Sequence, residues 1–131
     1  MRNLLLSFLL LSLFSFTALA EDEDIVYENA YLKMSPDLVS NVQGKSKYIR
    51  TSVQLMTNRA DLLYQIEEHL PLIRHLFLMT LVDKKGEVIK SAKGKEALRK
   101  ELLAIASKAL DQHTETKGLL TDLFFTTYYV Q

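Results

Sequence analysis

The sequence predicts an α+β domain, in which two or three helices pack on a small antiparallel or mixed sheet. Residues 48–57 alternate between apolar and polar side chains, the pattern of a strand buried on one face. Residues 62–81 and 93–112 instead place apolar side chains three and four positions apart, the pattern of amphipathic helices. Residues 119–131 are rich in aromatic and β-branched side chains, which favours a final strand.

The first twenty residues have the layout of a secretory signal. Arg2 precedes an apolar run over residues 4–16, and Ala18-Leu19-Ala20 follows as a signal peptidase site. The run is shorter than the roughly 20 residues that a membrane-spanning helix needs. We therefore expect export and cleavage after Ala20. An uncleaved short signal anchor is the alternative, because residues 4–20 carry no charge.

Composition fits one exported domain. The chain has 131 residues, and its 16 basic residues balance its 16 acidic ones, so no attraction to nucleic acid is expected. It contains no cysteine, so packing alone must hold it together in an oxidising compartment. Residues 21–30 begin with four acidic side chains and are expected to form a solvated lead, followed by a domain over residues 31–131.

Three strands are predicted in the first half of the domain. Residues 27–34 and 38–42 form two short ones, separated by a turn at Pro36, and residues 48–57 form the longest. Thr57 or Asn58 is expected to cap the helix that follows, because either side chain can accept a free amide hydrogen.

Helices are predicted in the second half. Pro71 interrupts the first and is well suited to begin another over residues 72–81. Residues 79–91 are ambiguous, since Asp83-Lys84-Lys85-Gly86 also suits a hairpin turn. Ser91 is a suitable cap for the helix over residues 93–112, and Gly118 lets the chain turn into the last strand.

Both alternating faces of the last strand are largely apolar. Residues 123–130 contain no charge, proline or glycine, which would be an aggregation hazard on an exposed edge. We therefore expect a central strand beneath the helices. The alternative is that one face docks on a neighbouring subunit.

No catalytic, cofactor or metal site is expected. The three histidines, His69, His75 and His113, show no pair at the spacing of three or four that places two metal ligands on one helical face. Glu68 precedes His69, but adjacent helical residues point apart, so an acid–base pair is a remote alternative. Nucleophile, phosphate-loop and calcium-loop motifs are missing from the sequence.

A basic cluster in the middle of the chain is the one charge asymmetry. Acidic residues are interspersed, so a solvated face is favoured, and a docking patch for an acidic partner or anionic lipid is the alternative. The candidate docking residues, which include two aromatic residues of the last strand, are Lys84, Lys85, Lys93, Lys95, Arg99, Phe124 and Tyr128.

From residue 31 to its end the chain resembles the periplasmic domain of FliL, the flagellar basal body-associated protein. The similarity lies in the order of several short motifs. These are Tyr31-Leu32 before Pro36, Val39-x-Asn41, the strand at 48–55, Glu68-His69-Leu70-Pro71-Leu72-Ile73-Arg74, Gly94-Lys95-Glu96-x-Leu98-Arg99, and Gly118 before Asp122-Leu123-Phe124-Phe125 and the terminal Val130-Gln131.

The resemblance implies a core similar to that of stomatin-like proteins, whose protomers can assemble into rings. It implies a non-enzymatic role, in which the domain associates with stator units and supports rotation and swimming or swarming. It also favours helix and loop over a hairpin at residues 79–91. The matched positions expected to be structural are Pro36, Asn41, Pro71, Gly94, Gly118, Phe125 and Gln131.

The N-terminus departs from the family pattern. FliL proteins usually carry a cytoplasmic segment, a full transmembrane helix and a polar linker, whereas here a signal-like segment leads almost directly into the domain. The protein is thus expected in the periplasm, or at the periplasmic face of the inner membrane through association or a short anchor. A soluble periplasmic binding or envelope-assembly module outside motility is the alternative function.

Overall fold

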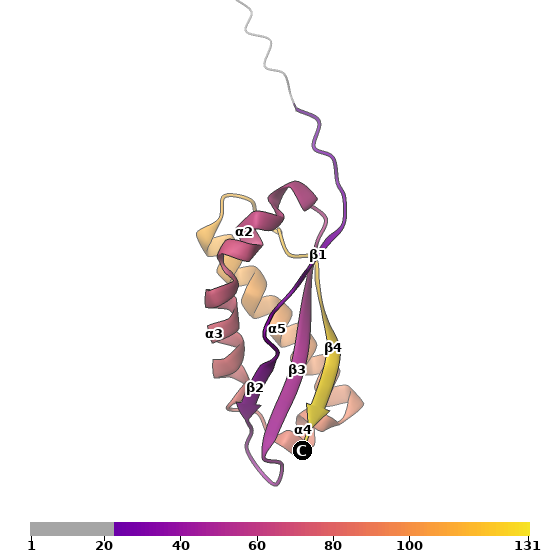
Figure 1. Ribbon diagram of the computed structural model, residues 1–131, viewed down its shortest axis with the longest axis vertical. Helices are drawn as coiled ribbons and strands as arrows, with labels where there is room; N and C mark the ends of the chain where they lie inside the picture. The colour runs from indigo at the N-terminus through magenta and orange to yellow at the C-terminus, as the bar shows by residue number, and fades with distance from the viewer. Residues whose placement is uncertain (1–22) are drawn as a thin grey trace, which may run out of the picture.

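The computed structural model describes residues 23–131, so the expected signal segment and cleavage after Ala20 lie outside the described residues. The predicted α+β class is confirmed (Figure 1). In chain order the elements are β1 (Ala30–Lys33), β2 (Leu38–Asn41), β3 (Tyr48–Thr57), the short 3₁₀ helix η1 (Ala60–Leu62), α2 (Leu63–Glu68), α3 (Leu70–Leu81), α4 (Gly86–Lys90), α5 (Ala92–His113) and β4 (Asp122–Val130). Among the described residues, no helix is both long and apolar enough to cross a bilayer.

The sheet is antiparallel and centred on β3. Strand β1 pairs with the end of β3 and β2 with its beginning, so both lie along one side of it. Strand β4 pairs with residues 49–56 on the other side and has β3 as its only partner in the sheet. The prediction that the last strand is central is therefore wrong. It is an edge strand (Figure 1).

A β-bulge explains why both faces of β4 looked apolar. Ser52 pairs with Thr127 but Val53 pairs with Phe125, which leaves Thr126 as an extra residue. The extra residue reverses the alternation, because one residue moves every later side chain to the opposite face. Before the bulge Leu123 and Phe125 face the helices, and after it Tyr128 and Val130 do, opposite the buried side chains of β3.

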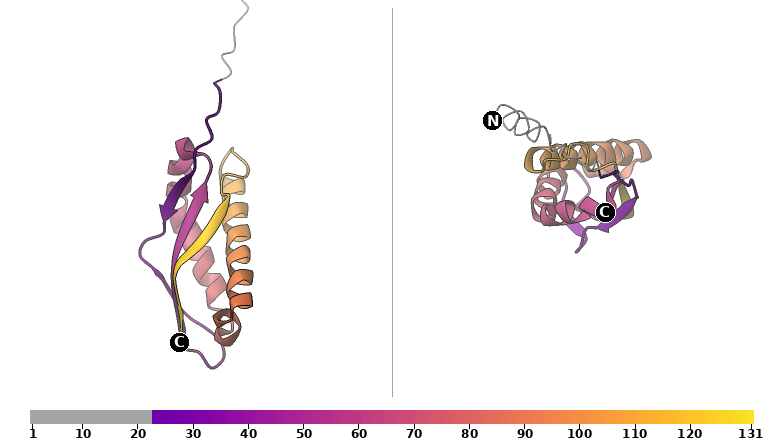
Figure 2. Two further views of the ribbon diagram at one scale, coloured as in Figure 1. Left: turned by 90° about the vertical axis from the view of Figure 1, so that its right-hand side faces the viewer. Right: turned by 90° about the horizontal axis from the view of Figure 1, so that it is seen from above.

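The helices cover one face of the sheet, as Figure 2 shows, and the core lies between these two layers. Phe77 of α3 and Leu102 of α5 are fully buried in one hydrophobic cluster with Leu55 of β3 and Leu123 of β4. Within residues 23–131 no helix covers the opposite face, and Tyr31, Val39 and Tyr129 are exposed on or beside it. The similarity to a stomatin-like core stays a prediction.

One of the two predicted helix caps is present in the structure. Ser91 caps α5 as expected, since its Oγ accepts a hydrogen bond from Gly94 N at 3.0 Å. Neither Thr57 nor Asn58 caps a helix, because η1 begins only after Arg59 and has no side-chain cap. Thr57 Oγ1 instead accepts from the backbone N–H of Arg59 at 3.0 Å, which fixes the turn leaving β3.

The ambiguous stretch is helical. Residues 86–90 form α4, so the hairpin alternative is wrong and the loop-and-helix expectation is confirmed. Pro71 lies in the first turn of α3, where its missing N–H removes no helical hydrogen bond. The first predicted strand is shorter than residues 27–34, with regular pairing only at Ala30–Lys33 and a single bridge between Glu28 and Arg59.

Candidate interaction surface

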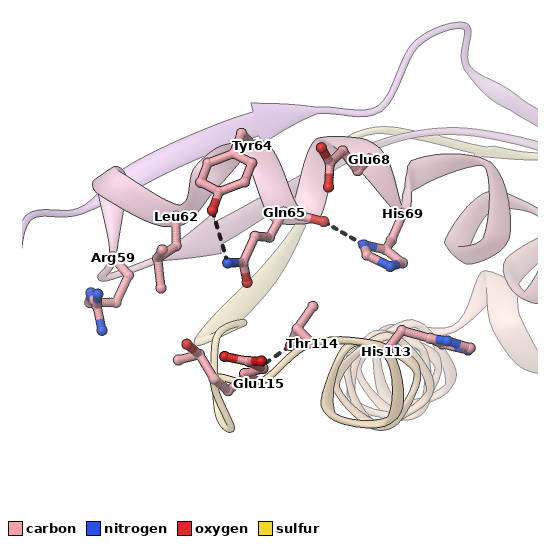
Figure 3. Close-up of a pocket in the computed structure, with 10 residues that line it drawn as sticks. Arg59, Leu62, Tyr64, Gln65, Glu68, His69, His113, Thr114 and Glu115 are labelled. Carbon is pink, nitrogen blue, oxygen red and sulfur yellow. Dashed lines mark hydrogen bonds between the residues drawn. The ribbon is translucent and has the colours of Figure 1, made fainter.

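A pocket of about 480 Å³ lies between the region around α2 and the end of α5 (Figure 3). His69 at the α2–α3 junction and His113 at the end of α5 both line it, and their rings stack with centroids 5.8 Å apart. Nδ1 of His69 lies 2.6 Å from the backbone oxygen of Gln65. Because a carbonyl only accepts, Nδ1 carries a proton and donates it to this bond.

Two carboxylates share this pocket with the histidines. Glu68 and Glu115 line it, but within residues 23–131 neither carboxylate hydrogen-bonds to a histidine. Gln65 Oε1 is buried there without a hydrogen-bond partner in this part of the chain. The remaining histidine, His75, is exposed on α3 and lies outside this pocket.

The predicted basic cluster divides between two sides of α5. Lys84 turns toward one side and forms an ion pair with Glu101 at 2.5 Å. Lys95 and Arg99 face the other side, beside β4. Lys85 and Lys93 are exposed at the starts of α4 and α5. The docking candidates therefore do not form one continuous patch.

A groove of about 260 Å³ runs between α5 and the free edge of β4. It brings together Lys95, Arg99 and Phe124 from the docking candidates and adds Phe125. Tyr128, next along the strand, lies with its ring centroid 4.9 Å from the Lys95 Nζ, a cation–π contact. The packing of β4 beside α5 thus brings four of the seven docking candidates onto one surface.

Arg99 fixes the wall of this groove. Its guanidinium donates to both oxygens of Glu96 at 2.7 and 2.8 Å, and to Asp122 Oδ1 on β4 at 2.6 Å. The hydrogen bonds to Glu96 raise the pKa of Arg99 above its usual range and lower the pKa of the Glu96 carboxyl. The bidentate pair with Glu96 holds the guanidinium in place on α5, and the bond to Asp122 ties α5 to the start of β4.

Tyr128 is anchored at the floor of the same surface. Its hydroxyl donates to the backbone oxygen of Ile89 at 2.6 Å, linking β4 to α4. Burial raises the pKa of Tyr128 to about 12. Phe125 packs against its ring, with centroids 4.9 Å apart. Of the two aromatic docking candidates, Phe124 is therefore the exposed one and Tyr128 is largely structural.

Several resemblance-derived positions sit at close contacts or turns. Pro36 and Asp37 accept hydrogen bonds from Arg74 of α3 through their backbone oxygens. Asn41 is exposed at the end of β2, and Gly118 adopts a φ of 66° in the turn before β4, a conformation that favours glycine.

The terminal residue closes the sheet. The backbone of Gln131 exchanges hydrogen bonds with Tyr48 at 3.0 Å and accepts another from Lys47 N. Its side-chain Oε1 accepts from the hydroxyls of Tyr129 at 2.8 Å and Tyr48 at 3.3 Å. The final glutamine therefore fastens the end of β4 to the beginning of β3.

Two residues of this surface belong to the basic cluster and to the apolar last strand but were not among the docking candidates. Lys90 of α4 and Tyr129 line a second groove of about 430 Å³ at the end of β4, together with Tyr128 and Gln131. The sequence feature that indicates this exposure is the apolar character of both alternating faces of the last strand. A strand that stays apolar on both alternating faces, yet lies at an edge, requires a bulge, and the bulge determines which aromatic residues are exposed.

Comparison with known proteins gives one result for most of the chain. The sequence profile of the family described as flagellar basal body-associated protein FliL matches residues 31–131. The matched range begins at the second residue of β1 and covers every later strand and helix described above. Among curated proteins, none matches this sequence.

Proposed function

Because the chain belongs to the flagellar basal body-associated FliL family, we propose that it supports the stator units of the flagellar motor and thereby rotation and motility under load. The observation that carries this proposal is the family match over residues 31–131, which is nearly the whole folded domain. The protein acts by contact rather than by chemistry. Its surfaces support such a role, since the β4 edge combines exposed aromatic and basic side chains.

The proposal includes location and assembly. The domain works in the periplasm or at the periplasmic face of the inner membrane, and it forms a homo-oligomer beside the motor. The signal-like residues 1–20 and an unpaired sheet edge support these two statements. Intact-mass measurement of the protein recovered from periplasm and membrane tests the location, because cleavage after Ala20 removes a defined mass.

An unmarked deletion tests the role. We expect swimming to fall most strongly in viscous medium, where each stator must deliver more torque, and restoration by the wild-type gene in trans. Torque measured from beads on single flagella separates a motor defect from a defect in flagellar number. Unchanged torque at high load in the deletion strain would refute the proposal.

Substitutions then connect the role to the β4 surface. Lys95→Glu combined with Phe124→Ala should reduce high-load motility while leaving the amount of protein unchanged. Lys108→Glu on α5 is the matched control, because Lys108 is exposed and lines neither groove beside β4. Equal motility of the two variants would place the stator contact elsewhere on the domain.

A further inference from the structure

Among the residues that the structure describes, no strand lies beside the outer edge of β4. Strand β4 is nine residues long, and in the described part of the chain it pairs only with β3. At Leu123 both backbone groups are already bonded, since Arg99 donates to the carbonyl at 3.3 Å and the N–H donates to Asp122 Oδ1 at 2.8 Å, so the edge open to another strand begins after Leu123. Proteins ordinarily cover or blunt such an edge, because its unpaired N–H and C=O groups accept an added strand.

Two grooves line this edge and define the chemistry of an occupant. The groove at Phe124 and Phe125 is mostly apolar, and the groove near the chain end contains Lys90. Within residues 23–131, Lys90 and Lys95 form no ion pair, whereas Arg99 is already neutralised by Glu96 and Asp122. The surface therefore suits an extended segment with acidic side chains at one end and apolar side chains at the other.

Such a segment is present in the chain itself. Glu23 and Asp24 are followed by Ile25, Val26 and Tyr27, which are 53%, 74% and 67% exposed. The segment is extended and leaves the domain beyond β1 (Figure 1). Residues 23–26 line a pocket of about 280 Å³ together with Arg59 and Asp61 of their own domain. Three consecutive exposed β-formers are unusual unless they pair elsewhere.

We infer that residues 23–27 of one copy of the protein add as a strand to the free β4 edge of a second copy. Glu23 and Asp24 lie toward Lys90 and Lys95, and Ile25 to Tyr27 lie along the groove at Phe124. The added strand runs antiparallel to β4, since that direction places the acidic end near residues 128–131. This contact specifies the self-association within the proposed function and rests on it.

The same copy cannot supply the strand. Glu28 is held beside β3 by hydrogen bonds with Asn58 and Ala60 at 3.0 and 3.1 Å. Crossing from there past β3 and β4 spans about three strand spacings, roughly 14 Å, whereas residue 27 lies one Cα step of about 3.8 Å from Glu28. A head-to-tail contact of this kind links successive copies into a ring or an open chain.

Sedimentation of the chain purified from cells that process it natively tests the contact. Lys90→Glu/Lys95→Glu should weaken self-association about tenfold or more, and Glu23→Lys/Asp24→Lys should do the same. Mixing these two variants should restore association, because the charges again complement each other. Lys45→Glu/Lys108→Glu, the same charge change away from the groove, should associate as the wild type does.

A disulfide trap provides a second readout, since the chain contains no cysteine. A Val26→Cys variant mixed with a differently tagged Phe124→Cys variant should give the mixed disulfide on oxidation. Val26→Cys mixed with Met79→Cys is the control, because Met79 is exposed on α3, away from β4.

Three outcomes would overturn the inference. They are a wild-type protein that stays monomeric, charge variants that associate as strongly as the wild type, and mixed disulfide no more abundant than in the Met79→Cys control. These outcomes are independent of motility. Unchanged torque in a deletion strain would refute the motor role while leaving the sedimentation and trapping results to decide the strand contact.

Discussion

Gly94 lies directly against the backbone oxygen of Val88: a Cβ atom built on Gly94 would stand 1.8 Å from it. No flexible side chain can move aside here, because the obstacle is the main chain of α4. Gly94 is also the residue whose N–H is capped by Ser91. The close approach of α4 to the first turn of α5 therefore depends on the missing side chain.

Replacing Gly94 tests whether the contact between α4 and α5 needs a residue without a side chain. Gly94→Ala should lower the free energy of unfolding by about 3 kcal/mol or more, because the turn between α4 and α5 must open to admit the methyl group. Urea titration followed by circular dichroism measures this loss. Gly118→Ala is the comparison: its cost should be only about 1 to 2 kcal/mol, since Gly118 has a positive φ but no atom within 4 Å of the added Cβ.

The bulge in β4 makes a second prediction. Deleting Thr126 should restore simple alternation while Phe125 stays opposite Val53 and Thr127 stays opposite Ser52, so Tyr128 and Val130 remain on the core side. We therefore expect the deletion to change the melting temperature little. Inserting one alanine between Thr127 and Tyr128 should instead turn Tyr128 and Val130 toward solvent and lower the melting temperature strongly, because the hydroxyl bond to Ile89 and the burial of Val130 are lost together. A deletion variant that melts well below the insertion variant would contradict this account of the bulge.

Acid stability should depend on Asp37. Its carboxylate accepts from Ser52 Oγ at 2.5 Å and from Arg50 at 3.1 Å, and these bonds, that of Ser52 first, lower its pKa. The unfolded state therefore binds a proton before the folded state does, so the unfolding free energy declines as the pH falls below about 4. Asp37→Asn should flatten this decline in urea titrations between neutral and acidic pH. If the unfolding free energy of the variant falls with decreasing pH as steeply as that of the wild type, this account is wrong.

Alkaline stability should depend on Tyr128. Its pKa of about 12 in the fold exceeds the value of about 10 for an unperturbed tyrosine. Above pH 10 the unfolded chain loses the hydroxyl proton of Tyr128 before the folded chain does. The stability that Tyr128 contributes is therefore complete below pH 10 and declines as the pH rises toward 12. Tyr128→Phe should be about 1 kcal/mol less stable at neutral pH and should show a shallower alkaline decline. Tyr129→Phe is the matched control because Tyr129 is exposed.

Local patterns were enough to locate most elements. Alternation identified the bounds of β3, and the apolar spacing, Pro71 and Ser91 identified α3 and the start of α5. These signals are local, since each depends on side chains within one turn or on neighbouring positions of one strand. The helix at residues 86–90 needed the family resemblance, because five residues give no readable period.

The position of β4 could not be read in this way. Apolar side chains on both alternating faces indicate a central strand only when the alternation is unbroken, and Thr126 breaks it. The division of the basic cluster was also hidden, because it depends on which side of α5 faces β4. Lys84 and Lys95 differ by eleven positions in the sequence but lie on opposite flanks of one helix.

The hydrogen bonds at Glu28 bear on how the domain carries mechanical force. In Figure 1 the segment before β1 leaves the molecule roughly along the direction of the strands. Tension applied through it would reach the bonds to Asn58 and Ala60 and then the β1–β3 pairs from Ala30 to Lys33. These bonds lie across the direction of pull, so they are loaded together in shear instead of being unzipped one at a time. Force entering from the N-terminal side therefore meets the domain in its mechanically resistant orientation.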